Sequence, residues 1–120
     1  MSERRGQAES APASEASQQK QARDGIAGLD PLLHHPSRLG ALVLLSNVDA
    51  MAFSRLKGLL GETDGNLGAQ LRKLEEAAYV TVKKEFVDRR PVSWYSLSPP
   101  GRKALRAHLG AMQKVIESAG

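Results

Sequence analysis

A short stretch in the middle of the chain places three side chains that can bind nucleic acid at helical spacing. Asn66, Gln70 and Lys73 are separated by four and three residues, so a helix would bring them to one face. The amides of Asn66 and Gln70 can form paired hydrogen bonds with adenine in the major groove of DNA. Thr63 can cap the same helix, whose free backbone N–H groups then suit a phosphate. This pattern predicts a surface for DNA.

A second group of basic side chains lies between two runs that are rich in β-forming residues. The runs cover residues 79–86 and 92–97, and the segment that joins them carries Arg89 and Arg90. Two alternating runs with a short connection predict a β-hairpin, here with a basic tip. Arginines at such a tip can enter a narrow minor groove, where the negative potential is concentrated.

The spacing of apolar residues predicts the helices that position these side chains. Leu29, Leu32 and Leu33 form a short amphipathic turn, and Pro36 fits the first turn of a helix that runs to about residue 47. A further helix covers residues 53–60, with Gly61 as its C-terminal cap. The candidate DNA helix spans residues 63–77. A last helix follows Gly101 and has an apolar stripe formed by Leu105, Leu109, Met112 and Ile116.

The composition divides the chain into two parts. Residues 1–28 contain almost no large apolar side chain, and their four basic residues are balanced by four acidic ones. We therefore expect a disordered N-terminal arm. The net charge of +4 then belongs to residues 29–120, which are long enough for one folded domain and suited to attract phosphate.

Several classes of function lack a basis in the sequence. The chain has no cysteine, and the adjacent His34 and His35 diverge on a helix, so neither a disulfide nor a metal site is expected. No nucleophile has an evident base, and we expect neither an enzyme nor a cofactor. The longest apolar stretch, residues 39–45, is far below the roughly 20 residues that cross a bilayer. We expect a soluble cytoplasmic protein, associated with the nucleoid.

The order of two helices, a tight turn, a further helix and a hairpin resembles the winged helix-turn-helix regulators related to the MarR and ArsR groups. The resemblance extends from about Leu29 to Ile116. It rests on His35-Pro36-Ser37-Arg38-Leu39, Thr63-Asp64-Gly65-Asn66-Leu67, Leu71-Arg72-Lys73-Leu74-Glu75-Glu76-Ala77 followed by Tyr79-Val80, Arg89-Arg90-Pro91, and Tyr95-Ser96-Leu97-Ser98 before Gly101-Arg102. It implies an α+β fold, mainly helical, with a two-stranded β wing and a long C-terminal dimerisation helix.

The resemblance also implies a function and the residues that carry it. The protein would be a homodimeric transcription regulator that binds a pseudo-palindromic site in double-stranded DNA. Regulators of this family are more often repressors than activators. The helix 63–77 would enter the major groove and the wing, residues 83–92, would contact the backbone or minor groove. The DNA-binding residues would be Thr63, Gly65, Asn66, Ala69, Gln70, Lys73, Lys84, Arg89 and Arg90. The dimer interface would contain Leu32, Leu105, Leu109, Met112 and Ile116.

Alternatives remain open at this point. The basic side chains can form an ordinary solvated surface, and the stripe on the last helix can cover the domain's own core. Gly68 and Ala69 stand where relatives often carry longer side chains, which leaves a protein-interaction module or a non-specific DNA-architectural protein as other functions. Ala78 replaces the glycine expected at the end of the helix. The sequence identifies neither a small-molecule effector nor the operator.

Overall fold

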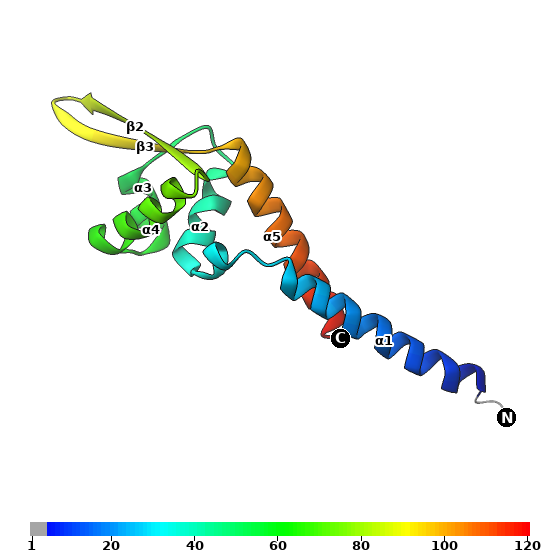
Figure 1. Cartoon of the computed structure of the whole chain (residues 1–120). Coiled ribbons are helices and arrows are strands. Elements are labelled where there is room, and N and C mark those ends of the chain that lie inside the picture. Colours follow the sequence, from blue (N-terminus) through cyan, green and yellow to red (C-terminus); the bar gives the residue numbers. More distant parts are fainter. Residues whose placement is uncertain (1–4) are drawn as a thin grey trace. The chain divides into compact units, whose positions relative to one another are not determined.

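The computed structural model describes the backbone of residues 5–120 and the side chains from residue 15 onward. The elements are α1 (Arg5–Ala27), the 3-10 helix η1 (Pro31–His34), α2 (Pro36–Leu45), β1 (Met51–Ala52), α3 (Phe53–Leu60), α4 (Asp64–Glu76), β2 (Val80–Val87), β3 (Arg90–Leu97) and α5 (Pro99–Ser118) (Figure 1). They form two compact units. Residues 30–106 make up the winged unit, and α1 with residues 107–120 makes up the helical unit.

Leucine side chains dominate the core of the winged unit. The buried cluster consists of Leu33, Ala41, Leu42, Leu45, Leu56, Leu67, Leu71, Leu74, Val80 and Leu105. Each fully buried leucine contributes roughly 1.5–3 kcal/mol through the removal of apolar surface from water. α2 begins at Pro36, whose fixed φ suits the first helical position, and Nδ1 of His35 accepts a hydrogen bond of 3.1 Å from the backbone N–H of Ser37.

The turn between α3 and α4 is built as the sequence predicts. Gly61 adopts φ 64°, a left-handed conformation that favours glycine, and closes the C-terminal end of α3. Thr63 is the N-cap of α4, and its hydroxyl accepts a hydrogen bond of 3.2 Å from the backbone N–H of Asn66. The predicted helix 63–77 is therefore confirmed as α4 together with its two capping residues.

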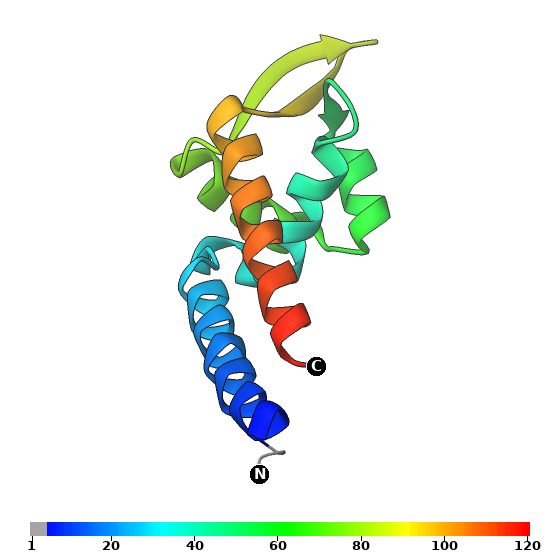
Figure 2. The same ribbon diagram turned by 90° about the vertical axis from the view of Figure 1, so that its right-hand side faces the viewer.

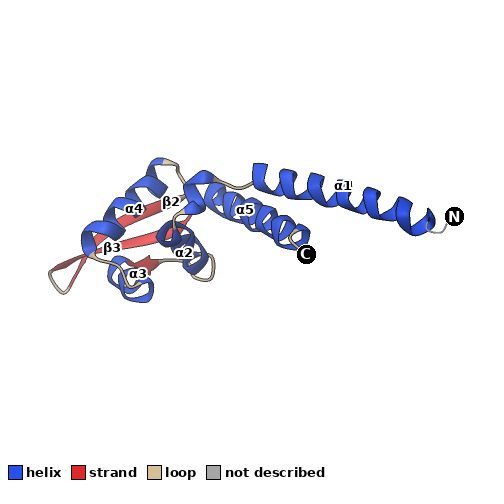
Figure 3. Ribbon diagram, turned by 90° about the horizontal axis from the view of Figure 1, so that it is seen from below, coloured by secondary structure: helices blue, strands red, loops and turns tan. Residues whose placement is uncertain are grey.

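The predicted hairpin is confirmed, and a third strand joins it. β2 and β3 pair antiparallel from Val80 opposite Leu97 to Val87 opposite Arg90. The short β1 pairs with the other side of β3, so the strand order is β1-β3-β2 (Figure 3). A strand of two residues carries no periodic signal, which is why the sequence predicts only a two-stranded wing.

The turn from α4 to β2 places Ala78 in a conformation that glycine prefers. Ala78 has φ 63°, and the backbone N–H groups of Tyr79 and Ala78 donate to the carbonyls of Leu74 and Glu75, at 2.9 Å each. These two bonds form a Schellman motif, the usual end of a helix before a left-handed residue. The geometry expected for a glycine is therefore present although the residue is alanine.

Gly101 allows the start of α5 to approach this turn. A Cβ atom at Gly101 would lie 2.0 Å from the carbonyl oxygen of Tyr79, so no other residue fits without a shift of the backbone. The hydroxyl of Ser98 donates to the carbonyl of Ala78 at 2.6 Å and accepts from the backbone N–H of Gly101 at 3.0 Å. The two ends of the hairpin are thereby tied together at its base.

The N-terminal segment differs from the disordered arm expected from the sequence, because residues 5–27 form α1. Gln21 Nε2 donates to Glu117 Oε1 at 3.1 Å, and a Cβ atom at Gly25 would lie 2.9 Å from the carbonyl oxygen of Ala111. α1 and the end of α5 therefore run antiparallel within the helical unit (Figure 2). Small residues bring the two backbones close together, and such contacts leave no apolar periodicity in the sequence.

The structure also changes the predicted dimer interface. Leu105 is only 4% exposed and belongs to the core of the winged unit, so its side chain is not available to a second chain. Leu32 is partly buried against the same core. In the helical unit, Leu109 is 42% and Ile116 60% exposed, while Met112 is partly exposed. The stripe on α5 therefore changes its role along the helix, from core to surface.

Candidate nucleic-acid interface

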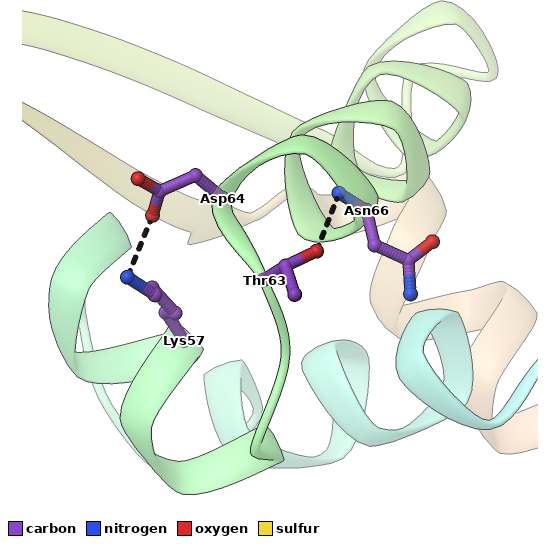
Figure 4. Close-up of polar contacts among 4 residues, drawn as sticks. All are labelled: Lys57, Thr63, Asp64 and Asn66. Atoms are coloured by element: carbon purple, nitrogen blue, oxygen red, sulfur yellow. Dashed lines mark hydrogen bonds and ion pairs between the residues drawn. The ribbon is translucent and has the colours of Figure 1, made fainter.

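The N-terminal end of α4 combines a capped first turn with an ion pair (Figure 4). Nζ of Lys57, on α3, lies 2.8 Å from Oδ1 of Asp64. Asp64 alone would repel a phosphate, and Lys57 offsets its charge. Both side chains are well exposed, so the pair contributes at most about 1 kcal/mol to stability. Its main effect is to leave the partial positive charge of the helix end for an anion. Sequence reasoning missed Lys57, since nothing in the local pattern indicates a pair between two helices.

The outer face of α4 carries most of the predicted contact residues. Thr63, Gly65, Asn66 and Lys73 are exposed, and Ala69 is partly exposed. In Figure 4 the amide of Asn66 points away from the Lys57–Asp64 pair. A Cβ atom at Gly65 or at Gly68 would meet no atom of its surroundings within 4 Å. Packing within the chain therefore does not require these glycines, and the backbone of α4 is open to a close approach from outside.

Gln70 does not lie on this open face, in contrast to the prediction from its spacing. Its side chain is 9% exposed, and its Oε1 accepts a hydrogen bond of 2.7 Å from Nη1 of Arg38. Its Nε2 donates to Oδ1 of Asn66 at 3.4 Å. The sequence could not indicate this, because Arg38 precedes Gln70 by 32 residues. Gln70 is therefore placed to hold the side chain of Asn66 through a hydrogen bond from the buried side of α4.

The tip of the wing presents the two predicted arginines to solvent. Arg89 and Arg90 are exposed, and Asp88 and Arg89 both have positive φ, at 51° and 65°. Two successive positive φ values are the geometry of the two-residue turn that matches the twist of a hairpin. This tight turn holds the arginines at the end of the hairpin, which projects beyond the helices of the winged unit (Figure 1).

The two faces of the wing carry different polar side chains. Residues alternate along a strand, so Lys84 and Phe86 share a face with the buried Val80. The opposite face carries Glu85, whose Oε1 accepts from Nε1 of Trp94 at 2.9 Å and whose Oε2 lies 4.0 Å from Nζ of Lys83. Lys84 therefore adds its charge on the side of the sheet where the core packs.

The base of the wing is fixed by Tyr95, next to Trp94. The rings of Tyr95 and Phe53 pack at a centroid distance of 6.4 Å, and Tyr95 contacts the core cluster. Burial raises the pKa of the Tyr95 hydroxyl, Glu75 raises it further, and Arg72 opposes the shift. Tyr95 thus anchors the hairpin to the core.

Comparison with known proteins gives a consistent family. A family model described as a winged helix DNA-binding domain matches residues 37–116. An uncharacterized protein of Methanocaldococcus jannaschii is 35% identical over 72 residues, which cover 60% of this chain and 78% of that protein. The residues that the family model matches include the whole of α4 and the whole of the wing.

Solved structures are similar in fold. A transcriptional regulator homologue from Pyrococcus horikoshii OT3 superposes with a TM-score of 0.73 at 25% identity, over 83% of this chain and 97% of that one. The transcriptional repressor CouR, solved with a 23-mer DNA duplex, gives a TM-score of 0.60 at 23% identity, over 87% and 70% of the two chains. The predicted winged helix fold and its likeness to MarR-type regulators are confirmed. Family and fold are those of transcriptional regulators, not of enzymes.

The described part of the chain offers no sign of two other kinds of site. None of its helices combines the length and the apolar character needed to span a bilayer. Within the same residues, no three histidine or acidic side chains are grouped so that they could hold a metal ion.

Proposed function

Since the chain belongs to the family of winged helix DNA-binding domains, we propose that it regulates transcription as a homodimer on a pseudo-palindromic DNA site. α4 enters the major groove, and the wing contacts the flanking backbone or minor groove. The observation that carries the proposal is the N-terminal half of α4. A capped helix end and an Asp64 paired with Lys57 lie there beside two glycines, Gly65 and Gly68, at which an added Cβ atom would meet no other atom within 4 Å. Such binding would place the protein with the nucleoid.

The residues proposed to contact DNA fall into two groups. On α4 they are Thr63, Gly65, Asn66, Ala69 and Lys73, and on the wing they are Lys84, Arg89 and Arg90. Thr63 and the helix N-terminus bind a phosphate, while Asn66 contacts a base edge. Gln70 leaves this set and acts through Asn66, because its side chain is buried.

The exposed apolar side chains of the helical unit support the dimer. Ile26 and Ile116 are each 60% exposed, and Leu109 is 42% exposed. A second copy that covers them would remove this surface from water, and two-fold symmetry would place two α4 helices about 34 Å apart on the DNA. Leu109→Lys with Ile116→Lys is expected to give a monomer in sedimentation equilibrium, whereas Ala107→Lys, at an exposed position on the opposite side of the same helix, keeps the dimer.

A repressor role is supported by the likeness to CouR, a repressor solved on duplex DNA. A regulator that occupies a site in a promoter acts most simply by excluding other proteins from it. A reporter gene placed behind a site that the protein selects from a random DNA pool is expected to be silenced by the protein, and activation of the reporter would contradict the repressor role.

Selection of binding sites from a random DNA pool tests the proposal as a whole. The wild-type chain is expected to enrich a site with two related halves. Asn66→Ala is expected to lose the preference at one base pair in each half, because the amide no longer contacts the base. Asn47→Ala, which removes an exposed amide at the end of α2, serves as the matched control. Equal binding of all duplexes by the wild type would contradict sequence-directed function and favour an architectural role.

A protein-interaction module is the second candidate, and Phe86 is the observation that favours it. Its side chain is 76% exposed on the wing, an unusual position for a phenylalanine. If the wing binds a protein, Phe86→Ser removes that binding and leaves affinity for the selected duplex unchanged. A loss of duplex affinity in Phe86→Ser would instead assign this side chain to DNA.

A further inference from the structure

A chain of hydrogen bonds connects η1 to the outer face of α4 through Arg38. Nε of Arg38 donates to the carbonyl oxygen of Leu32 at 2.5 Å, and its Nη1 donates to Oε1 of Gln70 at 2.7 Å. One guanidinium thereby joins the backbone of η1 to a side chain of α4. Both contacts lie within the winged unit.

The chain continues along α4 and ends on the turn that precedes it. Nε2 of Gln70 donates to Oδ1 of Asn66 at 3.4 Å, and Nδ2 of Asn66 donates to Oε1 of Glu62 at 2.5 Å. The other carboxylate oxygen of Glu62 accepts a hydrogen bond from the hydroxyl of Ser37, which is 5% exposed. The path thus returns to α2, close to Arg38 in sequence.

The two end groups of this chain of hydrogen bonds, Arg38 and Glu62, fix the direction of every bond between them. A guanidinium can only donate hydrogen bonds, and an ionised carboxylate can only accept them. Arg38 therefore binds the oxygen of the Gln70 amide, which leaves the nitrogen of that amide facing Asn66. Glu62 holds the nitrogen of the Asn66 amide, so its oxygen faces Gln70. A flip of the Asn66 amide would set its nitrogen against the nitrogen of Gln70 and its oxygen against the carboxylate of Glu62. This is unfavourable in the part-buried contact with Gln70 and less so in the exposed contact with Glu62.

The fixed orientation determines which hydrogen-bonding groups of the Asn66 amide remain free for a DNA base. An amide has two N–H donors and two acceptor lone pairs, and this chain uses one donor and one acceptor of Asn66. One N–H and one lone pair remain on an exposed side chain. Adenine offers the complement in the major groove, with N7 as acceptor and the N6 amino group as donor.

We propose that Arg38 and Glu62 are positioning residues that lock the Asn66 amide in the orientation that selects adenine. This inference rests on the proposed function, because it assumes that Asn66 faces a base in the major groove. It assigns to Gln70 the role of a link between Arg38 and Asn66. It also identifies two residues, Arg38 and Glu62, that contact no DNA and yet determine base preference.

Glu62→Gln tests the proposal with little change of shape. The new amide can either donate or accept, so position 62 no longer fixes the nitrogen of Asn66, and only the 3.4 Å hydrogen bond from Gln70 still opposes a flip. At the base pair identified by Asn66→Ala, the preference for adenine over the other bases is expected to fall about tenfold, within the range that one paired contact supplies. Glu76→Gln is the matched control, since it removes the same charge from an exposed site at the far end of α4 and should keep the wild-type preference.

Variants of Arg38 test the other end of the chain. Arg38→Lys keeps a group that only donates and is expected to retain most of the adenine preference. Arg38→Met frees the Gln70 amide and is expected to weaken the preference, while Glu62 still binds the nitrogen of Asn66. The thermal midpoint of each variant is measured in parallel, and base preference is compared among the variants that remain folded. A merely structural role would lower all affinities together without changing the ratio between bases.

The possible outcomes separate this proposal from the previous one. A wild type that binds all duplexes equally overturns both. A wild type that selects a site, together with Glu62→Gln selecting the same base with the same ratio, overturns only the positioning role. A preference at the Asn66 position for a base other than adenine also overturns it, because the remaining donor and acceptor would then serve another contact.

Discussion

The hydroxyl of Tyr79 donates a hydrogen bond of 2.6 Å to Oδ2 of Asp30, which joins the turn after α4 to the start of η1. Oδ1 of the same carboxylate accepts a hydrogen bond of 3.0 Å from the backbone N–H of Leu32. Leu32 is the residue whose carbonyl Arg38 holds. η1 is thus connected to α4 at two places, to the turn after α4 through Tyr79 and to the middle of α4 through Arg38 and Gln70.

Replacement of Tyr79 is expected to lower stability in a pH-dependent way. The hydrogen bond to Asp30, followed by burial and the charge of Asp30, raises the pKa of Tyr79 from 10.0 to about 12. Because the folded pKa lies above the unfolded one, this contribution is complete below pH 10 and is lost as the pH rises towards 12. Tyr79→Phe should therefore cost about 1.5 kcal/mol of unfolding free energy at pH 7.

Urea unfolding at a series of pH values measures this effect. The difference between Tyr79→Phe and the wild type should narrow above pH 10, where the wild type begins to lose its advantage. Tyr95→Phe is the control, since it retains the Tyr79–Asp30 bond and should stay closer to wild-type stability at pH 7. Equal stability of Tyr79→Phe and the wild type at pH 7 would show that the bond contributes nothing.

A glycine at position 78 is expected to stabilise the protein. Ala78 has φ 63°, a left-handed conformation that costs a residue with a Cβ atom roughly 1–2 kcal/mol. Glycine removes that strain but adds flexibility to the unfolded chain, so a net gain of about 0.5–1 kcal/mol is expected. Thermal unfolding should show a midpoint raised by a few degrees. Ala77→Gly, at the adjacent helical cap with φ −80°, should lower the midpoint, and a lowered midpoint for Ala78→Gly would contradict the prediction.

The sequence predicts α4 well because its signals are local. Thr63 and Gly61 mark helix ends by their own chemistry, and Leu67, Leu71 and Leu74 show the buried face by their spacing. The role of Gln70 escapes the same reasoning, because an amide on a helix has the same pattern whether it faces solvent or an arginine from another helix. α1 escapes it for a related reason, since a helix that packs through Gly25 lacks the apolar stripe that predicts a packed helix.

Gly68→Ala is expected to separate stability from binding. Alanine at an interior helical position is favoured over glycine by about 0.8–1 kcal/mol, and the added Cβ meets no atom of its surroundings within 4 Å. The variant should therefore be more stable, while its affinity for the selected duplex falls because the methyl group blocks close approach of α4. Gly58→Ala, on α3, has the same free space and should gain stability without loss of affinity. If Gly68→Ala binds as tightly as Gly58→Ala, this part of α4 does not approach the DNA closely.

The wing arginines are expected to determine part of the salt dependence of binding. Each phosphate contact releases condensed counterions, so log K falls as log salt rises. The loss of one contact reduces the magnitude of this negative slope by about 0.9. Arg89→Ala with Arg90→Ala should lower this slope by up to about 1.8, measured by fluorescence anisotropy on the selected duplex between low and moderate salt. Lys103→Ala with Arg106→Ala removes two exposed charges from α5 and is matched in net charge, so its slope should stay at the wild-type value. An unchanged slope in the wing variant would place Arg89 and Arg90 away from the phosphates, and equal changes in both variants would reduce the effect to net charge alone.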